Sequence, residues 1–478
     1  MLFNSVEFSI FLPIVFLLYW FVFNKSLKQQ NIFLLAVSYF FYGWWDWRFL
    51  SLIAFSSALD FYIGVALSKT ERKEKRKLLV LASLAVNLGF LGFFKYYNFF
   101  AEGFSDAFTL LGKSIEVSRL NIILPVGISF YTFQTLSYTL DVYNKKLKPT
   151  KSIISFFSFV SFFPQLVAGP IERASNLLPQ FYKKREFKYK PAVDGLRQIL
   201  WGLLKKIVIA DNCAEYVNEV FSNINNYPGS TLVLAAIFFA FQIYGDFSGY
   251  SDIAIGTSRL FGFTLMQNFS FPYFSRDIAE FWRRWHISLS SWFKDYLYIP
   301  LGGSKNGLAK SIRNTFIIFI VSGFWHGANW TFIVWGALNA IYILPLLLMK
   351  KNRTNLDTAA NGKIIPTLKE FIQITFTFSI TVFAWIFFRS ESISKAFKYI
   401  NRIFSKSFFS PPKDTPYLTL SFILFFLICE WIQRTKSHTL QIDDYNFPRY
   451  IRWSIYWVII FLIVSFGGFQ QKFIYFDF

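Results

Sequence analysis

The sequence predicts an all-α, polytopic integral membrane protein, and three observations favour this fold class. Hydrophobic residues occupy 54% of the 478 positions and charged residues 16%, against about 45–50% and roughly a quarter in soluble domains. Mean hydropathy is +0.38, so a soluble globule would have too little polar surface to stay in solution. The apolar residues form continuous runs, whereas a transmembrane β-barrel shows alternating segments of about ten residues.

About eleven apolar stretches approach the length that crosses a hydrocarbon core about 30 Å thick. The clearest runs are 6–23, 50–67, 79–94, 120–140, 231–244, 330–349, 370–388, 417–432 and 451–466. Shorter or broken runs, which we expect to be tilted, buried or re-entrant, are 32–44, 153–168, 197–210, 277–300 and 314–325.

The net charge of +21 is distributed in a way that favours a membrane protein over a nucleic-acid-binding protein. Basic residues cluster in short loops between apolar runs, for example at 69–77 and 145–151, and such loops are typically cytoplasmic. This pattern places the amino terminus outside the cytoplasm. The run 153–168 has basic loops on both sides and contains Pro164, so we expect a broken helix that re-enters rather than crosses.

One compact membrane domain over residues 1–478 is the simplest division, because no internal repeat or low-complexity linker is evident. The segments that carry chemistry fall at about 120–349. The two cysteines, Cys213 and Cys429, are isolated in apolar surroundings. We interpret both as small buried hydrophobic residues, without a role in catalysis or metal binding.

Two carboxylates interrupt an apolar run at 242–256. Asp246 and Asp252 lie there beside Gly245 and Gly249, whose spacing lets another backbone approach closely. An ionisable side chain inside a membrane segment costs on the order of 2.5–3.5 kcal/mol, so its presence needs a reason. Either these carboxylates line a polar, substrate-binding cavity, or they are structural and bond to basic side chains and freed backbone amides.

The stretch 276–303 mixes cationic and aromatic side chains, as is typical of a membrane–water interface. We expect an interfacial or re-entrant helix that ends near Pro300 and Gly302. Arg283 and Arg284 are suited to fork-like contacts with phosphate. A surface helix without chemistry has the same composition, so the sequence leaves both interpretations open.

Histidine is the residue type that points most directly to chemistry, and the chain has only three. His438 follows basic residues in a polar loop and is expected to be solvated. His326 lies in an apolar run between Gly323 and Gly327. A lone histidine there is usually a hydrogen-bonded core residue, but glycines on both sides would make room for a substrate. Desolvation favours the neutral imidazole, the form that a general base needs.

Three motifs, in this order, resemble the membrane-bound O-acyltransferase superfamily, and most closely its bacterial branch that contains the alginate O-acetylation membrane protein. They are GDFSGYSDIAIG at 245–256, FWRRWHISLSSWFKDYLYIPLGG at 281–303 and SGFWHGANWTFIVWG at 322–336. FLPIVFLLYW at 11–20, SFFPQLVAGPIERA at 161–174 and the terminal FIYFDF at 473–478 are also similar. The resemblance therefore covers nearly the whole chain.

The resemblance implies a membrane domain around a central tunnel, in a bacterial cell inner membrane. It implies transfer of an acyl group, most simply acetyl, from a thioester donor in the cytoplasm to a hydroxyl group that is reached from the other side of the membrane. The expected donor is acetyl-CoA or an acyl carrier protein. The expected acceptor is an exported or cell-envelope polysaccharide, delivered with an extracytoplasmic esterase-like partner. The donor is a co-substrate, and no tightly bound cofactor is expected.

The resemblance also implies residue roles. By position in the motifs, His326 is the intramembrane histidine, expected to be the general base, and His286 is the upstream histidine, which either holds the acceptor or assists proton transfer. The substrate-binding candidates are Asp246, Arg283, Arg284, Trp325 and Asn329. Asn329 or backbone amides nearby would stabilise the oxyanion. Two histidines 40 residues apart without a third ligand predict no metal site.

Three alternatives stay open from the sequence. D-alanyl transfer to a teichoic acid-like polymer is hard to separate from acetyl transfer. Asp246 and Asp252 with broken helices would suit an ion-coupled transporter or flippase, although no paired halves are evident. A scaffold for a cell-envelope complex would need neither His286 nor His326 for product formation.

Overall fold

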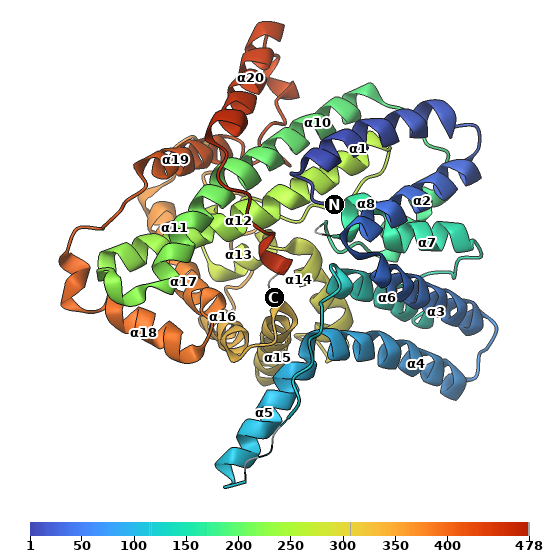
Figure 1. Ribbon diagram of the computed structural model, residues 1–478, viewed down its shortest axis with the longest axis horizontal. Helices are drawn as coiled ribbons and strands as arrows, with labels where there is room; N and C mark the ends of the chain where they lie inside the picture. The colour runs from blue at the N-terminus through green and yellow to red at the C-terminus, as the bar shows by residue number, and fades with distance from the viewer. Residues whose placement is uncertain (114, 116, 168, 306, 477–478) are drawn as a thin grey trace. The chain divides into compact units, whose positions relative to one another are not determined.

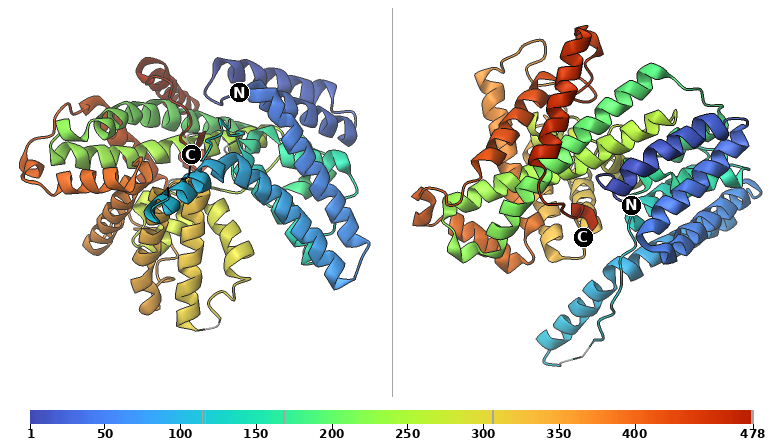
Figure 2. Two further views of the ribbon diagram at one scale, coloured as in Figure 1. Left: turned by 60° about the horizontal axis from the view of Figure 1, so that its bottom comes forward. Right: turned by 45° about the horizontal axis from the view of Figure 1, so that its top comes forward.

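The computed structural model describes residues 1–113, 115, 117–167, 169–305 and 307–476, and it contains helices but no β-strand within these residues (Figure 1, Figure 2). The prediction of an all-α protein is confirmed for this part of the chain. Contacts divide it into two compact units. One comprises Met1–Tyr189 and Ser258–Leu265, and the other Lys190–Thr257 and Met266–Phe478.

The first unit is built from nine α-helices among the residues that the structure describes. They are α1 (Val6–Leu17), α2 (Leu27–Asp46), α3 (Leu50–Ser68), α4 (Lys73–Leu91), α5 (Tyr97–Leu110), α6 (Ile128–Tyr143), α7 (Ile153–Ser161), α8 (Phe163–Leu166) and α9 (Ala174–Leu177). The run predicted at 120–140 becomes helical only at Ile128, after Gly127 in the left-handed region (φ 75°). Between α7 and α8, Phe162 leaves helical geometry (ψ 107°), as expected for a broken helix; Ala168 lies outside the described residues.

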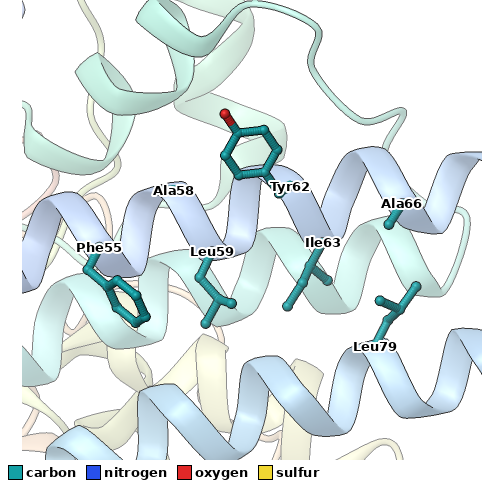
Figure 3. A pocket seen from close by; sticks show the side chains of 7 residues that line it. All are labelled: Phe55, Ala58, Leu59, Tyr62, Ile63, Ala66 and Leu79. Carbon is teal, nitrogen blue, oxygen red and sulfur yellow. The ribbon is translucent and has the colours of Figure 1, made fainter.

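Polar side chains hold three helices of this unit together. The carboxylate of Asp60 on α3 accepts hydrogen bonds from Ser83 and Asn87 on α4 and from Thr139 on α6 (2.5–2.8 Å). All four residues are buried, so their polar groups satisfy one another where water is excluded. The outer side of α3 and α4 is different. It forms a shallow apolar groove of about 390 Å³ that includes Phe55, Leu59, Ile63 and Leu79 (Figure 3), as suits a surface that faces lipid.

The second unit carries the remaining helices. They are α10 (Tyr189–Leu203), α11 (Asp211–Ser222), α12 (Gly229–Leu260), α13 (Ile278–Arg284), α14 (Ile287–Phe293), α15 (Leu308–His326), α16 (Trp330–Leu348), α17 (Leu368–Arg389), α18 (Ile393–Ile403), α19 (Tyr417–Ile432) and α20 (Arg449–Phe466). A π-helical segment, Leu204–Ala210, joins α10 to α11, and α10 runs beside α12 (Figure 1). A Cβ atom at Gly249 would lie 2.8 Å from the carbonyl oxygen of Gly202, and one at Gly245 would lie 2.8 Å from that of Lys205. The close backbone approach predicted from the glycine spacing is confirmed.

Six helical segments are long and apolar enough to cross a membrane, among the residues described. They are Leu27–Ser68, Lys73–Leu110, Gly229–Leu260, Trp330–Leu348, Leu368–Arg389 and Arg449–Phe466, and shorter apolar helices are Val6–Val22, Ile153–Leu166 and Tyr417–Ile432. The predicted number of eleven is not confirmed. One reason is that the run 197–210 contains Lys205 and Lys206, which are buried in ion pairs. Another is that 277–300 folds into short pieces: α13, α14 and the π-helical Lys294–Tyr298.

We expect Gly249→Ala to destabilise the protein, because the added Cβ would meet the backbone of α10, which cannot move aside alone. Overpacking of this kind costs about 1–3 kcal/mol, so the thermal unfolding midpoint in detergent should fall. Gly89→Ala on α4 is the matched control, since nothing lies within 4 Å of its Cβ position. Equal midpoints for the two variants would contradict the close α10–α12 packing.

Candidate active site

The second unit brings together two histidines that are forty positions apart in the sequence. His286 precedes α14, and His326 is the last residue of α15. Their ring centroids lie 6.5 Å apart, and the residues are 1% and 3% exposed. Two imidazoles this close and this dry form a site where proton transfer is shielded from water.

Aromatic rings surround His326. The centroid of its ring lies 5.0 Å from Trp325, 5.1 Å from Trp335, 5.4 Å from Phe388 and 5.6 Å from Tyr475. These rings come from α15, α16, α17 and the segment that follows α20. An imidazole in such surroundings is favoured in its neutral form, because burial penalises the charged one.

The chain turns sharply to present His286. Its backbone is in the left-handed region (φ 44°), between the end of α13 and the start of α14, where a non-glycine residue is strained by roughly 1–3 kcal/mol. The Ile287 N–H donates to the Asn268 carbonyl oxygen (2.9 Å), which fixes the turn. His286 lies between two seven-residue helices, outside the membrane-spanning segments. Burial lowers the pKa of His286 to about 3, so its imidazole is neutral at ordinary pH.

The glycines beside His326 have a different role from the predicted one. A Cβ at Gly323 would lie 2.2 Å from the carbonyl oxygen of Phe332, and one at Gly327 would lie 2.1 Å from the Phe332 ring. These glycines let α15 and α16 pack closely as an antiparallel hairpin, seen side by side in Figure 2. The prediction that they leave room for a substrate was therefore wrong, because α16 fills that space.

Asp246 is a partner in a buried ion-pair cluster. It is 2% exposed, and the ammonium group of Lys206 lies 2.8 Å from its carboxylate and 2.7 Å from that of Asp211. The second carboxylate of the motif, Asp252, pairs with Lys205 at 2.5 Å. Of the two interpretations of these carboxylates, the ion-pair interpretation describes the observed contacts.

The same cluster holds the segment that follows α20, residues 467–476, which we call the C-terminal tail. The Ile474 N–H donates to Asp246 (2.6 Å), and Lys206 donates to the Gln471 carbonyl oxygen (3.1 Å). The tail thereby brings the Tyr475 ring against His326 and within 4.4 Å of Phe247. The sequence interpretation missed Tyr475 as a site residue, although FIYFDF was one of the matched segments; Asp477 and Phe478 lie outside the described residues.

The two neighbouring arginines have different surroundings. Arg284 pairs with the buried Glu280 (2.9 Å) and donates to the Asp357 carbonyl oxygen (2.8 Å). Arg283 donates to the carbonyl oxygens of Asn352 and Asn355 (2.9 and 2.6 Å). Arg283, unlike Arg284, is among the described residues that line the large cavity of this unit.

This cavity, which we call the cationic cavity, has a volume of about 1080 Å³ and a strongly basic lining. Its basic residues are Arg283, Lys294, Lys305, Lys350 and Arg353, and no carboxylate lines it among the described residues. Trp282 is also in its wall, and the Trp282 ring lies 5.6 Å from Trp335, which in turn contacts His326. Neither histidine is among the described lining residues, and Trp282 and Trp335 form a chain of ring contacts from the cavity wall to His326.

Two other predicted residues lie in structural contacts. The side-chain oxygen of Asn329 accepts from the Thr331 N–H (3.0 Å) as the cap of α16, and its amide nitrogen donates to the Glu391 carbonyl oxygen (2.8 Å). His438 is buried, with its Nε2 2.9 Å from Asp194. The expectation of a solvated His438 was wrong, because the loop folds back on α10. Within the described residues, no three His, Cys, Asp or Glu side chains are grouped to hold a metal ion.

Comparison with known proteins identifies the family. The family model named MBOAT, membrane-bound O-acyltransferase family, matches residues 142–390, which contain both histidines and all the described lining residues of the cationic cavity. This chain belongs to the membrane-bound O-acyltransferase family. The resemblance found in the motifs is confirmed. As a member of this family with several long apolar helices, the chain is a multi-pass membrane acyltransferase.

Curated relatives cover most or all of this O-acyltransferase. The probable alginate O-acetylase AlgI of Pseudomonas putida is 37% identical over 403 residues, which are 84% of this chain and 80% of the relative. The peptidoglycan O-acetyltransferase of Helicobacter pylori is 32% identical over 528 residues, covering 100% of this chain and 98% of the relative. A teichoic acid D-alanyltransferase of Bacillus subtilis is 30% identical over 46% of this chain and 58% of the relative.

We expect Lys206→Met to lower the unfolding free energy by about 3–5 kcal/mol, because it leaves two buried carboxylates without their cation. Thermal unfolding measures this loss, and limited proteolysis should show earlier cleavage in the C-terminal tail. Lys145→Met is the control, since its exposed pair with Glu71 contributes about 0–1 kcal/mol. If Lys206→Met were no more costly than Lys145→Met, the cluster would not hold the tail.

Proposed function

We propose that this protein transfers an acyl group, most simply acetyl, from a thioester to the hydroxyl of an exported or cell-envelope polysaccharide. The observation that carries the proposal is the pair of buried histidines whose rings lie 6.5 Å apart inside an aromatic wall. The names of the relatives, alginate O-acetylase and peptidoglycan O-acetyltransferase, support this substrate class.

The proposed chemistry uses His326 as general base. An alcohol is a poor nucleophile at neutral pH, and the neutral imidazole removes its proton as the oxygen attacks the thioester carbonyl. The new C–O bond gives a tetrahedral intermediate, and its collapse breaks the C–S bond. The proton held by His326 passes to the leaving thiolate, so the imidazole returns to its neutral form. His286, whose ring lies 6.5 Å from that of His326, holds the acceptor hydroxyl.

The cationic cavity is the proposed entrance for the donor. Both acetyl-CoA and the pantetheine arm of an acyl carrier protein carry phosphate, and five basic side chains with no carboxylate among the described lining residues suit a phosphate. Loops rich in Lys and Arg are typically cytoplasmic, which favours the cytoplasmic face for this cavity. To reach His326, the thioester arm has to pass Trp282 and Trp335.

Two observations bear on the alternatives. The two O-acetylating relatives described above align with 84% and 100% of this chain, and the D-alanyl-transferring relative with 46%, so acetyl is the proposed acyl group. The carboxylates that suggested an ion-coupled transporter, Asp246 and Asp252, are paired with lysines. No structural observation favours transport.

The proposed setting is a bacterial inner membrane, with the amino terminus extracytoplasmic. The basic loops of the sequence support this orientation. An extracytoplasmic esterase-like protein is the proposed partner that completes delivery to the sugar. Membrane lipid is the other expected partner, and no nucleic acid is expected.

His326→Ala should reduce acyl transfer by roughly 10²–10⁴-fold, since it removes the general base. The measurement is transfer of labelled acetyl by the full chain in proteoliposomes supplied with acetyl-CoA outside. His438→Gln is the control, because its ring pairs with Asp194 away from the two catalytic histidines. If His326→Ala kept full activity, His326 would not be the general base. If the protein transferred only a D-alanyl group from its carrier, D-alanyl would replace acetyl as the proposed acyl group.

The double variant Lys350→Glu/Arg353→Glu should raise KM for the thioester about tenfold or more, because a charge-assisted contact contributes about 1.5–3 kcal/mol. We expect kcat to change little, since neither residue lies at the histidines. Lys406→Glu/Lys413→Glu on another exposed segment is the charge-matched control. An unchanged KM in the double variant would move the donor entrance elsewhere.

A further inference from the structure

Asn268 lies at the centre of a small buried network around His286. It is 0% exposed, in the loop that connects α12 to α13. Its side-chain oxygen, Oδ1, lies 3.0 Å from Nδ1 of His286 and accepts from the Ser288 hydroxyl at 2.9 Å. Its amide nitrogen donates to the Ser251 hydroxyl on α12 (3.0 Å). None of the sequence motifs assigned a role to Asn268.

The Asn268 side-chain amide could be placed in two ways, with its oxygen and nitrogen exchanged. The backbone N–H of Ser288, which can only donate, decides between them. The backbone N–H of Ser288 points at the same side-chain atom, 3.4 Å away. If the amide were reversed, its NH₂ group would face this N–H, and two donors would oppose each other without an acceptor. The oxygen therefore faces both Ser288 and His286. An amide oxygen accepts only, and the Ser288 hydroxyl, 3.4 Å from Nδ1 of His286, already donates to Asn268 at 2.9 Å, so Nδ1 of His286 has to carry the hydrogen.

We infer that Asn268 is a positioning residue that holds neutral His286 in its Nδ1–H tautomer, so that Nε2 presents its lone pair to the acceptor hydroxyl. This inference rests on the proposed function for the identity of that hydroxyl, but the tautomer itself does not. Nε2 is buried, and within the described residues it has no hydrogen-bond partner. The turn at His286 orients its ring toward the site. Two hydrogen bonds hold this orientation: the Ile287 N–H donates to the Asn268 carbonyl oxygen, and Nδ1 of His286 bonds to the Asn268 side chain.

The tautomer decides what His286 can do. With hydrogen on Nδ1, Nε2 accepts the hydrogen bond of an alcohol and orients its oxygen toward the thioester. With hydrogen on Nε2, the same ring would donate instead, and the alcohol would turn its proton away. Among the described residues, the titratable rings that approach His286 are His326 and Tyr475, and burial alone, without a charged partner, lowers the pKa of His286.

The first test reads the tautomer directly. In a chain labelled with ¹⁵N-histidine, protonated and unprotonated ring nitrogens have well-separated chemical shifts, and only three histidines contribute. Comparison with His286→Gln assigns the signals. We expect Nδ1 of His286 to be protonated and Nε2 unprotonated at neutral pH. The opposite assignment would overturn the inference, whether or not the protein transfers acetyl.

The second test compares two substitutions at position 268. Asn268→Ala should lower kcat roughly 10–100-fold, with KM little changed, because a lost orienting partner typically has an effect of this size. Asn268→Asp keeps an acceptor for Nδ1–H, and the Ser251 hydroxyl can rotate to donate to it. It should therefore preserve the tautomer and most of kcat at alkaline pH, where the kcat of the alanine variant stays lowered.

The aspartate variant also predicts a pH dependence with a defined sign. A carboxylate beside His286 favours the imidazolium and raises the pKa of His286 from its lowered value. As pH falls through the raised pKa, Nε2 takes a proton, its lone pair is lost, and kcat should fall roughly tenfold per pH unit. The wild type should lack the limb due to His286, and an acid limb that both enzymes share would report the general base His326.

Ser251→Ala is the matched control, because it removes the bond to the amide nitrogen and leaves the bond to His286. We expect it to keep the Nδ1–H tautomer and most of kcat. Equal losses in Asn268→Ala, Asn268→Asp and Ser251→Ala at every pH would show that Asn268 only supports the fold, and would overturn the inference. If neither the wild type nor the variants transferred acetyl while His286 kept its Nδ1–H tautomer, the proposed function would be contradicted and the inference about Asn268 would stand.

Discussion

Removal of water from ionisable groups is the constraint on which the second unit depends. A charge that leaves water needs a partner of opposite sign, and a neutral polar group needs a hydrogen bond. Lys206 meets this requirement with two carboxylates, and Glu280 meets it with Arg276 and Arg284. His286 meets it by remaining neutral. The proposed proton abstraction from an alcohol also needs a neutral, dry imidazole, so in this proposal one constraint serves stability and chemistry together.

The buried ion pairs therefore define the geometry of the site without forming part of it. Asp246 accepts the backbone N–H of Ile474, one residue before the tyrosine that packs on His326. Residues from α12, from the π-helical segment after α10 and from the C-terminal tail meet at this cluster. A carboxylate in a motif can thus matter to a reaction that it never touches.

The fold class and the histidine pair were predictable because their signals are local. Apolar runs predict helices one at a time, and His326 stands out in an apolar segment. The number of spans was not predictable, since Lys205 and Lys206 lie in a run whose cations find partners far away in the sequence. Tyr475 and Asn268 were missed for a similar reason: their importance comes from contacts with residues 149 and 18 positions away. Gly323 and Gly327 were misinterpreted, because a missing side chain indicates close packing as readily as open space.

The indole pair formed by Trp282 and Trp335 has a consequence for the cell that contains the protein. An energised membrane loses its proton gradient through any continuous file of water, and a pore wide enough for a thioester would be such a leak. Trp282 lines the cationic cavity, Trp335 contacts His326, and the two rings meet edge to face, so this closed pair would seal the one from the other. The indole pair would then open only when the thioester donor arrives, and acyl transfer would proceed without dissipating the proton gradient.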